Sequence, residues 1–135
     1  MSAPGGNGPS LPLILARELA ANLATPMFII DSAGMLVYYN EAAEVMLGKT
    51  FAELGQVTAN EFGTMLEVAY PDGTPMRRRD TPAGIAMFQR RPAHLTVQAS
   101  TLDGRRGTFE VTAYPLFGRT DEMHGVVTVF WGETS

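Results

Sequence analysis

One stretch of this 135-residue chain decides its fold: Pro26-Met27-Phe28-Ile29-Ile30-Asp31-Ser32-Ala33-Gly34-Met35-Leu36-Val37-Tyr38-Tyr39-Asn40-Glu41-Ala42-Ala43. Residues 27–30 and 35–39 are rich in β-branched and aromatic side chains, which favour strands. Asp31 and Gly34 lie between them, and they supply a carboxylate that can accept a turn N–H and a residue that tolerates a positive φ. This pattern predicts a β-hairpin.

A capped helix should follow the hairpin directly. Asn40 occupies the position of a helix N-cap, because its short side-chain oxygen can accept a free N–H of the first turn. The helix should continue over residues 42–47 and end at Gly48, a residue type common just after a helix. Thr50 and Glu53 have the spacing of a capping box, which predicts one more short helix. The expected order is strand, strand, helix, short helix.

This order resembles the opening of a PAS sensory domain. Such domains begin with a strand ending in Asp, a turn ending in Gly, a second strand closing on Asn, and an Ala-rich helix ending in Leu-Gly. The resemblance continues through a turn at residues 72–75, a helix after Thr81-Pro82, and three strands. It implies an α+β fold with a five-stranded antiparallel sheet in the order 2-1-5-4-3, helices over one face, and an N-terminal amphipathic helix. The matching residues are Asp31, Gly34, Asn40, Ala42, Ala43, Leu47, Gly48, Glu53, Leu54 and Gly55.

The PAS-like domain is expected over residues 24–132, with short segments on either side. Residues 1–9 are rich in glycine and proline and should be a disordered or vector-derived tail. Residues 10–23 should form the N-terminal amphipathic helix, because Ser10 is a candidate N-cap and leucine recurs every four residues. The resemblance implies that residues 133–135 are a C-terminal tail leading toward an output domain on the same polypeptide.

The leucines of this N-terminal helix permit two interpretations. Leu11, Leu15, Leu19 and Leu23 form one stripe, which either only covers the domain's own sheet or also pairs with a second copy of the chain. Leu13 lies off the stripe and would add exposed apolar surface to such a contact. The second interpretation predicts a homodimer formed through this helix and the sheet.

Three strands should complete the sheet. Apolar and polar residues alternate over 95–100 and over 109–114, which is typical of strands with one buried and one solvated face. Residues 126–131 are apolar on both sides. This last strand should therefore be central, with the N-terminal helix covering its second face.

Two helical segments should cover the other face of the sheet and enclose a pocket. Residues 60–68 can form a helical turn or two, and a helix capped by Asp80 or Thr81 should run to the arginines before Pro92. Methionines on these helices would make an adaptable apolar wall, with plain core packing as the alternative. The candidate pocket residues are Phe28, Ile30, Leu36, Met46, Phe62, Met65, Ile85, Phe88, Leu95, Val97, Val111 and Val129.

Composition limits the function. The chain has no cysteine, which excludes disulfides, thiolate metal sites and a cysteine nucleophile. A net charge of −4 disfavours direct binding to nucleic acid. No apolar run approaches the roughly 20 residues of a membrane span, and the N-terminus does not have the order of a secretion signal. We therefore expect a cytoplasmic protein with no membrane partner.

No residue pattern indicates an enzyme or a metal site. His94 and His124 are isolated and lie off the helix on which haem-binding PAS domains place their axial ligand, so haem is not expected. Covalent flavin chemistry needs a cysteine and is excluded, whereas a flavin held without a covalent bond stays open. The arginine groups at 77–79, 90–91 and 105–106 should be solvated, with an anionic ligand head group as the alternative.

The resemblance implies a sensory domain of a bacterial signal-transduction or transcription-regulatory protein. Such a domain would bind a small apolar or anionic molecule, dimerise, or do both. A ligand-free interaction and dimerisation module is the first alternative, and a small α+β cone enzyme is the second. The sequence identifies no cofactor.

Overall fold

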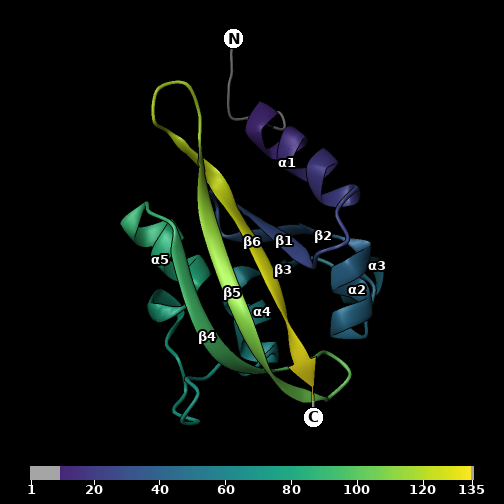
Figure 1. Ribbon diagram of the computed structural model, residues 1–135. Coiled ribbons are helices and arrows are strands. Elements are labelled where there is room, and N and C mark those ends of the chain that lie inside the picture. The colour runs from purple at the N-terminus through teal and green to yellow at the C-terminus, as the bar shows by residue number, and fades with distance from the viewer. Residues whose placement is uncertain (1–9, 135) are drawn as a thin grey trace.

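The computed structural model describes residues 10–134, which form one antiparallel sheet with helices on both faces (Figure 1). The expected tail at residues 1–9 lies outside the described residues. The strands are β1 (Met27–Asp31), β2 (Met35–Tyr39), β3 (Val57–Thr58), β4 (Ala93–Ser100), β5 (Arg106–Phe117) and β6 (Met123–Thr134). The helices are α1 (Leu11–Ala21), α2 (Glu41–Leu47), α3 (Phe51–Leu54), α4 (Ala59–Met65), the 3-10 turn η2 (Arg78–Asp80) and α5 (Pro82–Gln89).

The sheet has the order β3-β2-β1-β6-β5-β4, so it contains six strands where five were expected. The five expected strands are in the expected order. The additional strand, β3, has two residues, and Val57 pairs with Leu36 at the edge of β2. A strand this short is held by its neighbour and leaves no alternating pattern in the sequence. At the other end of the chain, Glu133 and Thr134 pair with β5 inside the sheet, although a tail was expected there.

Side chains of the turn and the caps hold the first hairpin and the helices that follow. Oδ1 of Asp31 accepts hydrogen bonds from the backbone N of Ala33 (3.0 Å) and of Met35 (2.9 Å), and Gly34 has φ +85°. Asn40 caps α2, because its Oδ1 accepts from the backbone N of Ala43 at 3.0 Å. The hairpin and the cap thus have the contacts that the sequence predicts.

Capping boxes begin two of the other helices. Thr50 and Glu53 form the expected box at α3, where each side chain accepts from the other residue's backbone N–H. Thr58 and Glu61 form the same reciprocal pair at α4. The second box has the same Thr-x-x-Glu spacing, so the sequence contained the signal for it. Thr81 caps α5 by accepting from the backbone N of Gly84 at 3.0 Å.

Helix α1 packs on the sheet, but with the opposite face to the one expected. Ala20 is fully buried, and Leu13 and Ala16 are half-buried against the side of the sheet that contains Ile29 and Val127. The expectation that Leu13 is extra exposed surface was wrong. The physical reason is close approach, since small alanines let the helix backbone come near the strands, and leucines in their place would hold it away.

The other face of the sheet is covered by α2, α4 and α5. Its main core cluster includes Tyr39, Leu47 and Phe62. A smaller cluster of Ala86, Ala113 and Val126, all with no exposed surface, joins α5 directly to β5 and β6. Figure 1 shows α5 lying along this sheet and the long β5–β6 hairpin projecting beyond the shorter strands. Between these two clusters the packing leaves a space.

Candidate functional site

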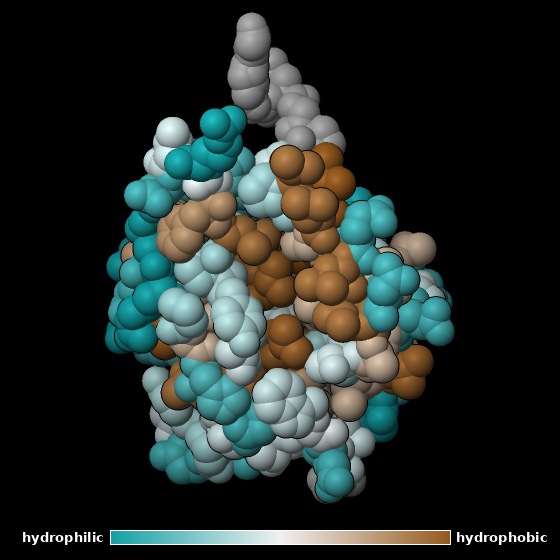
Figure 2. All heavy atoms as spheres, turned by 45° about the horizontal axis from the view of Figure 1, so that its top comes forward, coloured by the Kyte–Doolittle hydropathy of each residue, from teal (hydrophilic) through white to brown (hydrophobic). Residues whose placement is uncertain are grey.

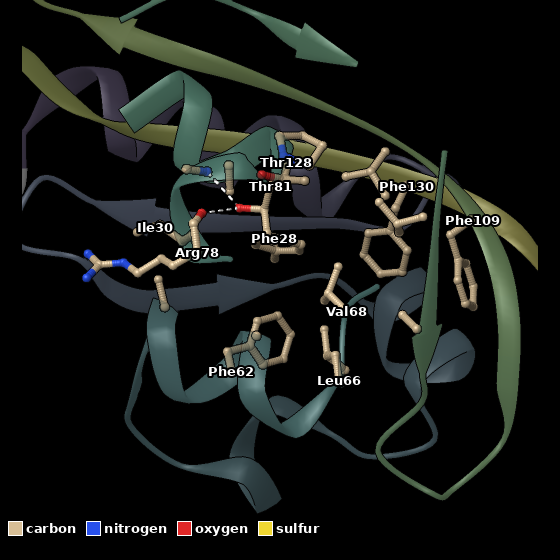
Figure 3. Close-up of a pocket in the computed structure, with 18 of the residues that line it drawn as sticks. Phe28, Ile30, Phe62, Leu66, Val68, Arg78, Thr81, Phe109, Thr128 and Phe130 are labelled. Atoms are coloured by element: carbon tan, nitrogen blue, oxygen red, sulfur yellow. Dashed lines mark hydrogen bonds between the residues drawn. The ribbon is translucent and has the colours of Figure 1, made fainter. Parts of the chain in front are cut away.

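The space is an apolar cavity of about 120 Å³ between the sheet and the helices α4 and α5 (Figure 3). Strands β1, β4, β5 and β6 supply its floor, and α4, η2 and α5 supply its walls. The lining residues are Phe28, Ile30, Gly34, Leu47, Ala59, Phe62, Gly63, Leu66, Val68, Arg78, Thr81, Pro82, Ala83, Gly84, Met87, Phe88, Val97, Ala99, Ser100, Thr101, Phe109, Val111, Thr128 and Phe130.

Aromatic rings make much of the wall. The ring centroids of Phe28 and Phe62 are 5.3 Å apart with the planes at 78°, an edge-to-face contact. The ring centroid of Phe130 lies 6.4 Å from that of Phe109, also edge-to-face, and 5.9 Å from that of Phe28, where the planes are tilted at 50°. Edge-to-face pairs of this kind hold each ring in a fixed orientation. The rings therefore act as rigid walls on one side of the cavity, which favours a preformed space.

Most hydroxyl groups of the lining are already engaged. The Thr81 hydroxyl donates to the carbonyl oxygen of Arg78 at 2.8 Å. Ser100 accepts from the Arg106 guanidinium at 3.1 Å, and Thr101 donates to Asp103. In contrast, Thr128 is fully buried, and its Oγ1 has no hydrogen-bond partner within residues 10–134.

Arg78 is the one charged side chain among the described residues of the lining, and it lies at the rim. Its guanidinium carbon is 5.1 Å from the ring centroid of Phe88, a cation–π contact, and that of Arg79 is 4.9 Å from the same ring. Figure 3 shows the Arg78 side chain directed away from the labelled phenylalanines. The interior of the cavity is therefore uncharged.

The structure brings half of the sequence-predicted pocket residues to the cavity. Those that line it are Phe28, Ile30, Phe62, Phe88, Val97 and Val111. Leu36 is fully buried in the neighbouring core, Met46 and Leu95 are half-buried against that core, and Ile85 is half-buried on α5. None of these four lines the cavity.

Two of the predicted residues point elsewhere. Met65, at the end of α4, is 43% exposed, so the expectation that it faces inward was wrong. Val129 packs on the α1 side of the sheet with Ile29. The last strand is apolar on both faces, so alternation alone could not identify its cavity side, and Val129 was assigned to the wrong face.

Several lining residues were not among the predicted pocket residues, although strand alternation identifies them. Phe109 lies on the same face of β5 as Val111, and Thr128 and Phe130 share the cavity face of β6. Choosing the face of β6 that pairs with Val111 would have found Phe130, because these two residues are directly opposite. Leu66 and Val68 follow α4 and also line the cavity. Helical turns over residues 60–68 predict an inward position for both, although neither was among the candidate pocket residues.

The described residues give no metal site, and the histidines lie outside the cavity. The ring of His94 contacts Thr112 at 2.6 Å and Glu110 at 2.9 Å on the exposed side of the sheet. His124 lies 3.1 Å from Glu122. In residues 10–134 there is no group of three side chains able to hold a metal ion. None of the helices in that part of the chain has the length and apolarity needed to cross a membrane.

The lining does not fit the ring system of a flavin. The edge of an isoalloxazine carries several nitrogen and oxygen atoms, and each needs a hydrogen-bond partner when buried. The described lining has no Asn, Gln or His side chain, and Thr128 supplies its one free buried hydroxyl. The cavity instead suits a compact molecule with few polar atoms.

Known proteins resemble this chain in fold. A crystal structure of a PAS domain from Colwellia psychrerythraea has a TM-score of 0.63 and 15% identity, covering 90% of this chain and 97% of that one. The PAS domain of the fruit-fly ELK potassium channel has a TM-score of 0.70 and 12% identity, covering 91% and 98%. The fungal blue-light photoreceptor Vivid, in its light-state dimer, has a TM-score of 0.62 and 17% identity, covering 94% and 97%. No curated protein sequence matches the chain.

The family comparison agrees with the structure. The family described as PAS fold matches residues 15–54, the segment that runs from α1 through the first hairpin to α3. The solved structures extend the same fold over 90% of the chain or more. With the strand order β2-β1-β6-β5-β4 and the helices over its cavity face, this chain has the PAS fold.

Proposed function

We propose that this domain is the sensory module of a bacterial signalling or transcription-regulatory protein and that it binds a small molecule in the cavity. The observation that carries the proposal is the apolar space of about 120 Å³ inside the fold. For comparison, an apolar engineered cavity of about 150 Å³ stays dry and binds benzene. A single ring or a short aliphatic chain therefore matches this space in size and polarity.

Signalling would follow from the position of α5. This helix and η2 form one wall of the cavity, so a ligand that contacts them favours one of their positions over others. An output domain on the same polypeptide would receive that change. The similar structures include a photoreceptor and a potassium channel, and this range supports a sensory role without indicating the signal.

Toluene is expected to raise the melting temperature of the protein, because a ligand that binds only the folded form stabilises it by about 2.7 kcal/mol at 100 times its Kd. Val111→Phe should abolish the shift by filling the cavity. Val45→Phe is the matched control, since Val45 is 74% exposed on α2 and outside the cavity. Thermal melts of the unmodified chain and of both variants, with and without toluene, measure the effect. If toluene leaves all three melts unchanged, the interior takes no ligand and the domain is an interaction module.

Homodimerisation is the second proposed function, and the exposed face of α1 favours it. Leu11, Leu15 and Leu19 are 64%, 59% and 58% exposed, and Ile14 and Leu23 add to the same surface. Figure 2 shows apolar side chains gathered next to the grey N-terminal residues, where α1 lies. Since the opposite face of α1 already packs on the sheet, a second copy can cover the leucines without unfolding either chain. Vivid was crystallised as a dimer, which agrees with this proposal.

The double variant Leu15→Lys/Leu19→Lys is expected to be monomeric where the unmodified chain is dimeric. Its melting temperature at low concentration should change little, because both side chains are exposed in the single chain. Sedimentation at micromolar concentration gives the oligomeric state, with Val45→Lys as an exposed control outside α1. An unmodified chain that sediments as a monomer at every concentration would remove the dimer proposal.

A further inference from the structure

We infer that the ligand of the cavity is a small carboxylic acid in its anionic form, with its apolar body inside the cavity and its carboxylate at the guanidinium of Arg78. This inference rests on the proposed small-molecule function and specifies the chemistry of the ligand. The cavity meets the surface at Arg78 and Phe88, the two exposed residues among the described part of its lining. The mouth of the cavity therefore lies between η2 and the end of α5.

The guanidinium of Arg78 lies at this mouth, next to two of the elements that form it. Its carbon is 5.1 Å from the ring centroid of Phe88 on α5. It also lies beside the β1–β2 turn, since a Cβ at Gly34 would be 3.9 Å from Nη2 of Arg78. Gly34 and Phe88 both line the cavity, and Figure 3 shows the Arg78 side chain at the end of the cavity away from Phe109. A ligand that extends from the cavity to solvent therefore meets this guanidinium.

The positive charge at the mouth is not balanced by the protein. Within residues 10–134, no carboxylate forms an ion pair with Arg78. The nearest acid in the sequence, Asp80, pairs with Arg77 at 3.3 Å. The guanidinium of Arg79 adds a second positive charge, 4.9 Å from the ring centroid of Phe88. Such a local excess of positive charge attracts an anion, although the chain as a whole has a net charge of −4.

A carboxylate is favourable at the mouth and unfavourable elsewhere in the cavity. The interior is apolar, and a carboxylate buried there would have no counter-ion. Arg106 does not line the cavity, and it already donates to the carbonyl oxygen of Glu67 and to the hydroxyl of Ser100. At the mouth, a carboxylate keeps part of its hydration and can accept two parallel hydrogen bonds from the planar guanidinium of Arg78. The acid is therefore oriented with its charge outward and its apolar body inward.

Hydrocinnamate and its neutral amide test this inference, because both carry one ring on a two-carbon arm and they differ in charge. Calorimetry at neutral pH and low salt should give the acid a Kd about tenfold lower than the amide, the effect of one hydrogen-bonded charge pair. This preference should disappear in Arg78→Gln. It should be smaller at high salt, because the mouth is open to solvent. Arg78→Lys keeps the charge but loses the two parallel donors, so it should retain part of the preference.

Arg91→Gln is the matched control, because Arg91 is also exposed, lies just beyond α5 and does not line the cavity. It removes the same charge and should leave the preference for the acid unchanged. A preference that persists in Arg78→Gln, or that is also lost in Arg91→Gln, overturns the role of Arg78.

The same probes separate this inference from the proposed function on which it rests. Equal binding of the acid and the amide to the unmodified chain overturns the inference but leaves the small-molecule proposal standing. The inference also fails if neither probe binds while toluene still raises the melting temperature, since the cavity then takes only an apolar ring. If neither probe binds and toluene has no effect, the proposed small-molecule function itself fails.

Discussion

Asn40→Ala is expected to lower the free energy of unfolding by about 3 to 5 kcal/mol, well above the ~1 kcal/mol of an ordinary cap. Asn40 is almost completely buried, and its Oδ1 accepts from the backbone N of both Ala43 and Met27, each at 3.0 Å. Its Nδ2 donates to the carbonyl oxygens of Ala20 (3.0 Å) and Thr25 (2.9 Å). One side chain thus joins the end of α1, the following linker, β1 and α2. Removing it leaves several buried backbone groups without partners.

Two further variants separate the cap from the other contacts. Thr50→Ala removes an exposed cap, at α3, and should lower the unfolding free energy by about 1 kcal/mol. Asn40→Asp keeps the capping oxygen but replaces the donor with a carboxylate facing carbonyl oxygens, so it should be at least as damaging as Asn40→Ala. Urea denaturation measures all three. Equal losses for Asn40→Ala and Thr50→Ala would mean that the bonds to α1 and the linker contribute nothing.

Gly84→Ala is expected to lower the unfolding free energy by about 3 kcal/mol, at the upper end for overpacking. A Cβ at residue 84 would lie 1.9 Å from the carbonyl oxygen of Arg78 and 3.0 Å from the Cα of Arg79. Both are backbone atoms of η2, so relief requires α5 to move away from η2. Since both elements line the cavity, the variant should also weaken toluene binding.

Gly63→Ala is the matched control, because Gly63 is also a helical glycine of the cavity lining. A Cβ there would meet no atom within 4 Å outside its own helix. This variant should raise the unfolding free energy by about 0.5 to 1 kcal/mol, since alanine loses less backbone entropy in a helix. Urea denaturation of the two variants gives the comparison. If both change stability in the same direction, close contact between α5 and η2 does not limit residue 84.

The sequence determined the features whose contacts span two to four residues. The Asp31 turn, the Asn40 and Thr81 caps and the Thr50–Glu53 box each use one side chain and a nearby backbone N–H. Such bonds depend on residue type and spacing, so a pattern predicts them without knowledge of the rest of the fold. In this chain they fixed the order of the elements, and with the PAS resemblance they gave the arrangement of the sheet.

Tertiary packing decided which side of each element faces which neighbour. Leucines on α1 suggested a buried stripe, yet Ala16 and Ala20 face the strands because only small side chains allow that helix to approach so closely. On β6 both faces are apolar, and the placement of α1 on one side and α5 on the other decided that Thr128 and Phe130 line the cavity while Val129 does not. The full role of Asn40 likewise depends on Ala20, twenty residues away. The cavity and its unpaired hydroxyl are properties of how these surfaces meet, and no short segment of sequence contains them.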